Sequence, residues 1–242
     1  MKKRSGIVFV LLAFFCFSSH SHTVTFFTPS MDWSFVTGLS IENGKDFDTN
    51  IAAVDFCAEC NMKQLVMNAG MKVQPSQFDF STEAIYWPEF INCLNVGFGT
   101  IFHTNYYHDI YCEIDFLAGV YAKYRTPEKF DCMLNLSLMT KQARIFAIED
   151  KVPWLGNNTI AFRTEFNYRP IDKLDIFLML GSYTQYRYML FLAPDFKIGA
   201  EYAFLPVFSL GGQVEIQYID MFTLSSNLNS VDFRIYSRIM LK

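Results

Sequence analysis

The body of this sequence alternates between apolar and polar residues with a period of two. The last twelve residues show the pattern clearly. Their odd positions are Val231, Phe233, Ile235, Ser237, Ile239 and Leu241, and their even positions include Asp232, Arg234, Arg238 and Lys242. Because successive side chains of an extended chain point to opposite faces, a β-strand turns this order into one apolar face and one charged face. A helix would mix the two sets.

The alternation recurs along the chain and predicts an all-β protein of twelve strands. Turn signals such as Thr126-Pro127, Arg169-Pro170 and Leu205-Pro206 separate the strands, and short turns alternate with longer loops in the second half. The strands are expected at residues 33–41, 50–58, 64–74, 77–87, 91–104, 110–124, 130–147, 159–169, 173–187, 196–204, 207–218 and 231–242. Without segments 50–58 and 77–87 the count falls to ten, and counts of ten or eight stay open as alternatives.

Three of these segments carry more specific expectations. Segment 130–147 loses its alternation near residues 140–144, which predicts a bulge or the point where the strand leaves a membrane. Segment 173–187 has apolar residues on both faces, which predicts packing against a plug or a constricted lumen. A hairpin turn at 223–230 would place Glu215 roughly opposite Arg234.

The first twenty-one residues have the features of a signal peptide. Lys2, Lys3 and Arg4 precede a short apolar run, and Ser19-His20-Ser21 offers small residues for cleavage after Ser21. Removing this segment moves the formal net charge from −4 to −7, which gives no reason to expect nucleic acid as a partner. The predicted domains are therefore a signal peptide at 1–21 and one β-barrel domain at 22–242.

The apolar face is expected to point outward, toward lipid. Charged residues make up only 18% of the chain, whereas soluble domains hold roughly 25%. Aromatic residues gather near the strand ends, for example Tyr86, Tyr124 and Tyr168, where a ring with one wet end suits a membrane interface. No segment after residue 21 has the roughly eighteen consecutive apolar residues of a membrane-spanning helix. A soluble barrel or sandwich with its apolar face inside is the alternative.

Over residues 31–242 the pattern resembles the small bacterial outer-membrane β-barrel proteins, in architecture and without a specific family motif. The resemblance implies an antiparallel transmembrane barrel with an even number of strands in the bacterial outer membrane. The partners it implies are the lipid bilayer and the outer-membrane assembly machinery. The chain departs from such barrels at its end, where Met240-Leu241-Lys242 stands in place of the Phe that often closes the last strand.

The charged face would then line the lumen. On this register the inward residues are Lys72, Glu83, Glu113, Asp115, Lys123, Lys141, Arg163, Glu165, Lys197, Glu201, Glu215, Arg234 and Arg238. Two interpretations stay open for this set. The ions pair to keep a structural barrel closed, or they line a narrow porin-like pore for small solutes. Their mixture of signs suggests no particular solute.

Other residue clusters predict little chemistry. Cys57 and Cys60 have the spacing of a redox motif, and a local disulfide between them is one alternative to free apolar thiols. His103 and His108 lack the nucleophile and the orienting group of a hydrolase, so we expect no enzyme, no catalytic residue, no metal site and no cofactor. The alternative function is a surface adhesin or ligand-binding barrel that contacts host surface molecules through loops such as 148–158 and 223–230.

Overall fold

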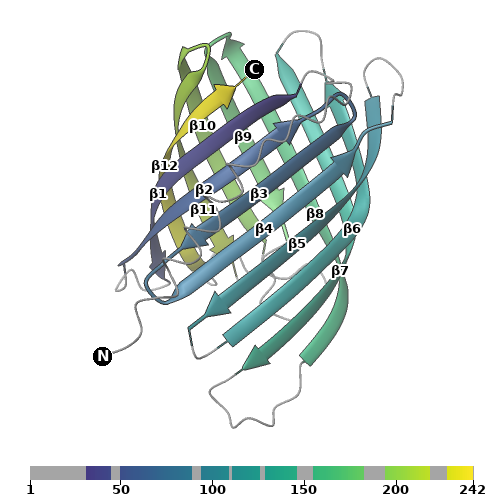
Figure 1. Cartoon of the computed structure of the whole chain (residues 1–242), viewed down its shortest axis with the longest axis vertical. Helices are drawn as coiled ribbons and strands as arrows, with labels where there is room; N and C mark the ends of the chain where they lie inside the picture. The colour runs from purple at the N-terminus through teal and green to yellow at the C-terminus, as the bar shows by residue number, and fades with distance from the viewer. Residues whose placement is uncertain are drawn as a thin grey trace, which may run out of the picture.

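The structure is one closed antiparallel β-barrel of twelve strands (Figure 1). It is a computed structural model that describes residues 31–44, 50–88, 94–108, 111–125, 129–145, 155–182, 194–218 and 228–241. Each strand pairs with its neighbours in chain order, and β1 pairs with β12 to close the ring. The strands are β1 (Asp32–Gly44), β2 (Asn50–Asn61), β3 (Leu65–Val73), β4 (Gln77–Tyr86), β5 (Leu94–Tyr107), β6 (Tyr111–Arg125), β7 (Phe130–Ile145), β8 (Leu155–Ile171), β9 (Leu174–Gly181), β10 (Asp195–Leu205), β11 (Phe208–Tyr218) and β12 (Leu228–Leu241).

All twelve predicted strands are present, and the alternatives of ten or eight strands are wrong. The segment at 50–58, which an even count required, is β2. The described residues contain no helix long and apolar enough to cross a membrane. The predicted signal peptide at 1–21 and the last part of the predicted strand at 173–187 lie outside the described residues.

The bulge predicted in segment 130–147 is absent, because β7 pairs without a register shift with both β6 and β8. The alternation fades near 140–144 for a different reason. Thr140 and Gln142 stay on the outward face, but they are polar where Leu134, Leu136 and Leu138 are apolar. This end of β7 therefore extends past the apolar part of the outer face, as the second of the two expectations for this segment stated.

The outer face of the barrel is apolar. Leu138 on β7 exposes 71% of its surface and Ile235 on β12 exposes 73%. Large apolar side chains are also exposed on the strands next to these two, which are β6, β8, β11 and β1. A soluble protein rarely exposes apolar surface this extensive, whereas a lipid bilayer covers it. Tyr86, Tyr124 and Tyr168 are exposed at the ends of β4, β6 and β8, which share one rim. They are placed as an interfacial aromatic girdle would be.

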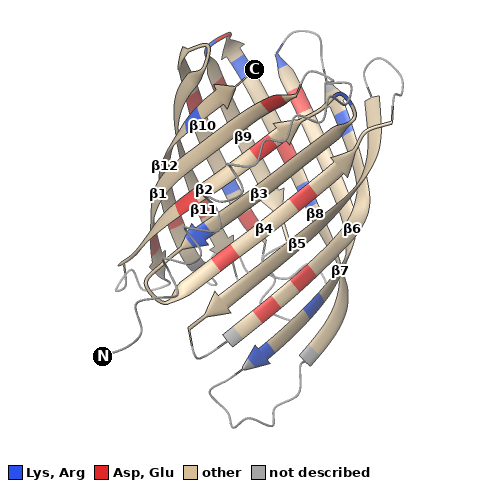
Figure 2. Cartoon of the chain, in the orientation of Figure 1, with Lys and Arg blue, Asp and Glu red and all other residues tan. Residues whose placement is uncertain are grey.

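The inner face is polar and charged, except for one apolar cluster. Figure 2 shows charged positions along the strands through the height of the barrel. On the wall formed by β5 to β8, Ile101, Leu117, Met139 and Ala161 pack together with little exposure. The barrel is thus packed along one side of its interior, and charges occupy the remainder.

Candidate functional site in the barrel interior

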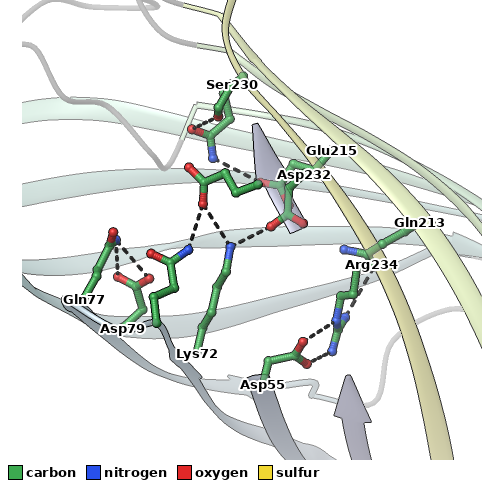
Figure 3. A network of polar contacts seen from close by, with 12 residues as sticks. Asp55, Lys72, Gln77, Asp79, Gln213, Glu215, Ser230, Asp232 and Arg234 are labelled. Carbon is green, nitrogen blue, oxygen red and sulfur yellow. Dashed lines mark hydrogen bonds and ion pairs between the residues drawn. The ribbon is translucent and has the colours of Figure 1, made fainter. Parts of the chain in front are cut away.

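Ion pairs that skip over strands show which face is internal. Lys72 Nζ of β3 lies 2.6 Å from Asp232 Oδ2 of β12 and 3.3 Å from Glu42 Oε2 of β1 (Figure 3). Strands β1 and β2 separate β12 from β3 around the ring. Side chains on the convex side diverge from one another, so a contact across two strands forms only inside the barrel. The predicted inward direction of Lys72 therefore follows from its contacts.

Arg234 of β12 reaches across β1 to Asp55 of β2 (Figure 3). Its Nε donates to Asp55 Oδ2 at 2.9 Å, and its Nη2 donates to Oδ1, so the guanidinium holds the carboxylate with two bonds. The pair passes over Gly38, where a Cβ would lie 2.5 Å from Asp55 Oδ2 and 2.8 Å from Arg234 Nε. The missing side chain of Gly38 is what lets this ion pair lie close to the wall.

The same side of the barrel holds three further ion pairs. Arg238 contacts Glu59 of β2, and its Nε lies 3.1 Å from Glu201 Oε1 of β10. Lys197 Nζ lies 2.9 Å from Glu215 Oε2 on the neighbouring strand β11. Side chains of these pairs keep between 16% and 25% of their surface exposed. Solvent can therefore reach the charged groups of these pairs. We name the six strands β10, β11, β12, β1, β2 and β3 the open wall.

A second set of charges spans the barrel from β8 to β4. Arg163 Nη2 lies 2.6 Å from Glu83 Oε1, and its Nε lies 2.9 Å from Glu165 Oε1. The hydroxyl of Tyr121 on β6 donates to Glu83 Oε1 at 2.9 Å. Three strands lie between β4 and β8 in the ring, so this link crosses part of the lumen and narrows it.

The third set is closed off from solvent. Lys141 Nζ of β7 lies 2.6 Å from Glu113 Oε1 and 3.5 Å from Asp115 Oδ2 of β6, and all three side chains expose 8% of their surface or less. Together with the apolar cluster, these residues make β5 to β8 a packed wall. A cavity of about 220 Å³ lies between the two walls and is lined by residues that include Gly70, Glu83, His103, Asp115 and Arg163.

Three of these side chains could offer ligand atoms to a metal ion. His103, Glu113 and Asp115 bring one such atom each to within 4.8 Å of one another, and His103 Nδ1 lies 3.3 Å from Asp115 Oδ2. The ammonium of Lys141 contacts both carboxylates and so supplies the positive charge that a metal would bring. The chemistry of the cluster is that of an internal salt bridge.

The other candidate residues follow the predicted faces, with one change of register. Lys123 pairs with Asn95 and Met133 on the inward side. Glu215 stands opposite Asp232 and Arg234 stands opposite Gln213, so the predicted pairing of Glu215 with Arg234 is wrong by two residues. Alternation cannot distinguish registers that differ by two residues, because a shift of two residues leaves every side chain on the same face.

The disulfide considered for Cys57 and Cys60 does not form, because both thiols are free. The two residues are three apart on β2, so they point to opposite faces of the strand. Three residues of strand span roughly 10 Å, and a disulfide needs its two Cα atoms within about 7 Å. The local strand geometry therefore excludes the bond, and the free-thiol alternative holds.

Some interior residues were missed from the sequence. Leu117, Tyr121 and Met139 point inward although they are large and apolar. The sequence holds a signal for Tyr121, which is the glycine at position 99. Gly99 lies under the ring of Tyr121, and a Cβ on residue 99 would lie 2.8 Å from Tyr121 Cε2. An inward glycine in β5 makes room for a ring from β6.

Comparison with known proteins supports the fold. No protein-family model matches the chain, and no curated protein matches it in sequence. Among solved structures, the KdgM porin matches with a TM-score of 0.58 at 8% identity, over 86% of this chain and 99% of that one. The NanC porin matches with a TM-score of 0.60 at 9% identity, over 86% of this chain and 100% of that one. KdgM has also been solved in complex with disordered oligogalacturonate.

The outer membrane phospholipase A from Escherichia coli matches with a TM-score of 0.49 at 8% identity, over 91% of this chain and 93% of that one. At such identities the likeness concerns the fold. The likeness to the two porins shows that the chain has the fold of the bacterial outer-membrane β-barrels, as the alternation predicts. Within that class this twelve-stranded barrel is similar in structure to the KdgM and NanC porins.

Proposed function

We propose that this protein is an outer-membrane channel that passes small solutes through a narrow, charged lumen. The observation that carries the proposal is the difference in side-chain exposure between charged residues of the two walls. Lys72 and Arg238 on the open wall keep 25% and 24% of their side-chain surface exposed, whereas Lys141 on the packed wall keeps 8%. A barrel closed by ion pairs throughout would bury both sets alike. The likeness to two porins over nearly their whole length supports the same function.

Several further properties belong to this proposal. Residues 1–21 act as the export signal, and the outer-membrane assembly machinery inserts the barrel into the bilayer. The protein works as a passive pore without enzymatic activity. A role as an adhesin would depend on loops such as 148–158 and 223–230, most of whose residues lie outside the described part of the chain.

Conductance across a planar bilayer tests the proposal. The full chain, refolded and shown to be folded by its heat-dependent migration on a gel, is expected to give discrete current steps. In the variant Gly70→Trp the step size should fall, because Gly70 faces the cavity between the walls and the indole ring would occupy it.

The matched control is Gly212→Trp, because Gly212 pairs with Ala200 and Ile235 on the outward face, where the added ring enters lipid. This variant should conduct as the parent does. Folded parent protein that inserts and stays silent would overturn the pore and favour the closed structural barrel. Equal losses in both glycine variants would show that the current does not pass between the two walls.

A further inference from the structure

The inward positions of the twelve strands carry more acidic than basic residues. Among the described side chains, strand register places fifteen Asp or Glu and eight Lys or Arg on this face. The acidic ones are Asp32, Glu42, Asp55, Glu59, Asp79, Glu83, Glu113, Asp115, Asp131, Glu165, Asp175, Asp195, Glu201, Glu215 and Asp232, and the basic ones are Lys72, Lys123, Lys141, Arg163, Arg169, Lys197, Arg234 and Arg238. The sequence predicted a mixture of signs that suggests no particular solute, and the register shows an excess of acidic residues.

The contacts show how this excess is distributed. Five of the basic residues are each shared by two carboxylates, so carboxylates outnumber bases by two to one within each of these groups. The five groups are Lys72 with Glu42 and Asp232, Arg238 with Glu59 and Glu201, Arg163 with Glu83 and Glu165, Lys141 with Glu113 and Asp115, and Arg169 with Asp131 and Asp175. The excess charge is thus spread around the ring.

Two of the five groups lie on the open wall, where ions in the lumen would meet them. The carboxylate of Glu42 exposes 30% of its side chain and that of Glu59 exposes 25%. Asp79 of β4 lies near this wall, where Gln77 donates to it at 3.2 Å (Figure 3). His103 Nε2 lies 4.0 Å from Asp79 Oδ1. Within the described residues these acids offer negative charge that is only partly compensated.

We propose that the lumen prefers small cations to anions. This inference rests on the proposed function and names the class of solute for that same pore. A barrel wall in lipid is a medium of low dielectric constant, so the field of the charges that line it is concentrated in the lumen. Rings of Asp and Glu select cations in channels by this effect.

A lumen that prefers cations would disfavour the kind of molecule that is present in the KdgM complex. Oligogalacturonate, which is present in a KdgM complex, carries a carboxylate on every sugar and is a polyanion. A lumen with an excess of carboxylates repels such a chain.

The reversal potential of the refolded full-length chain in a planar bilayer tests the inference. With a tenfold gradient of KCl at low ionic strength, the permeability for K⁺ should exceed that for Cl⁻ by about threefold or more. The ratio should shrink toward one in about 1 M salt, where the screening length falls to about 3 Å. A ratio of one or an anion preference at low salt would overturn the inference while leaving the pore intact. Absence of current would overturn the pore itself.

The double variant Glu42→Gln, Glu59→Gln tests whether the carboxylates of the open wall produce the cation preference. Each amide oxygen can still accept from Lys72 or Arg238, so the fold should persist, and heat-dependent gel migration checks that it does. The K⁺ to Cl⁻ ratio should fall toward one. The control Asp172→Asn removes one charge in the exposed turn between β8 and β9 and should leave the ratio unchanged. A double variant with the parental ratio would contradict the role of the open wall.

Discussion

At Gly119 the strand β6 comes closer to β7 than any side chain allows. A Cβ there would lie 2.1 Å from Ser137 Oγ and 2.4 Å from the carbonyl oxygen of Leu136. Backbone cannot move aside as a flexible side chain can, so Gly119→Ala should lower the free energy of unfolding by about 2 kcal/mol. Denaturant titration of the refolded protein in detergent micelles measures the loss.

Gly212→Ala is the matched control for this prediction. Its Cβ would meet only the carbonyl oxygen of Arg234, at 3.8 Å, which is an ordinary contact. The control should change stability by less than about 0.5 kcal/mol. Equal losses for the two alanines would mean that the close approach at Gly119 is not what makes glycine necessary there.

The sequence predicts the direction of single residues better than their partners. Arg234 and Arg238 were expected to point inward, and both do. Their main partners Asp55 and Glu59 are 179 residues away along the chain, and they meet only because β1 closes the ring between β12 and β2. No local pattern encodes that closure. The sharing of one base by two acids was missed for the same reason, since Lys72 and Arg238 each bind acids from strands that are distant in sequence.

At the scale of the strand, β7 offers a depth test of the membrane assignment. Leu136 and Gln142 lie on the same outward face, the first within the apolar part and the second beyond it. Leu136→Arg should destabilise the folded barrel by about 2–4 kcal/mol, because the charge enters the hydrocarbon region. Gln142→Arg should cost about 1 kcal/mol or less.

Equilibrium unfolding in lipid vesicles measures both β7 variants under one set of conditions. The ratio of the two losses is more informative than either value, since the substituted side chain is the same. Two small and equal losses would contradict the outward, lipid-facing assignment of this strand.

Whole strands were predicted well because alternation is a local property. Every strand was found, most of them within three residues of its observed ends. Segment 130–147 left two alternatives, a bulge or the point where the strand leaves a membrane, and only the bulge is wrong, because β7 is regular. A run of polar residues has the same appearance in sequence whether a bulge shifts the phase of the strand or a regular strand extends past the apolar part of the outer face. Sequence alone does not distinguish the two.

At the scale of the whole molecule, closure and an even strand number follow from the antiparallel order of twelve strands. The unequal walls of the interior do not follow from it. They depend on Leu117, Tyr121 and Met139, which are large and apolar although the alternation assigns their positions to the polar, inward face. This packing fills the side of the interior at β5 to β8. The proposed solute path therefore lies along the open wall, and the charges of the open wall produce the proposed cation preference.

The central claim is that apolar side chains face lipid and polar side chains face a wet lumen. Spin labels on single cysteines at Gln213, Val214, Ile216 and Gln217 of β11 test it most directly, in protein whose native cysteines are replaced and which is refolded into vesicles. Collision with dissolved oxygen, which concentrates in lipid, should be high at Val214 and Ile216. Collision with a water-soluble nickel chelate should be high at Gln213 and Gln217. The opposite phase, or no alternation, would contradict the account.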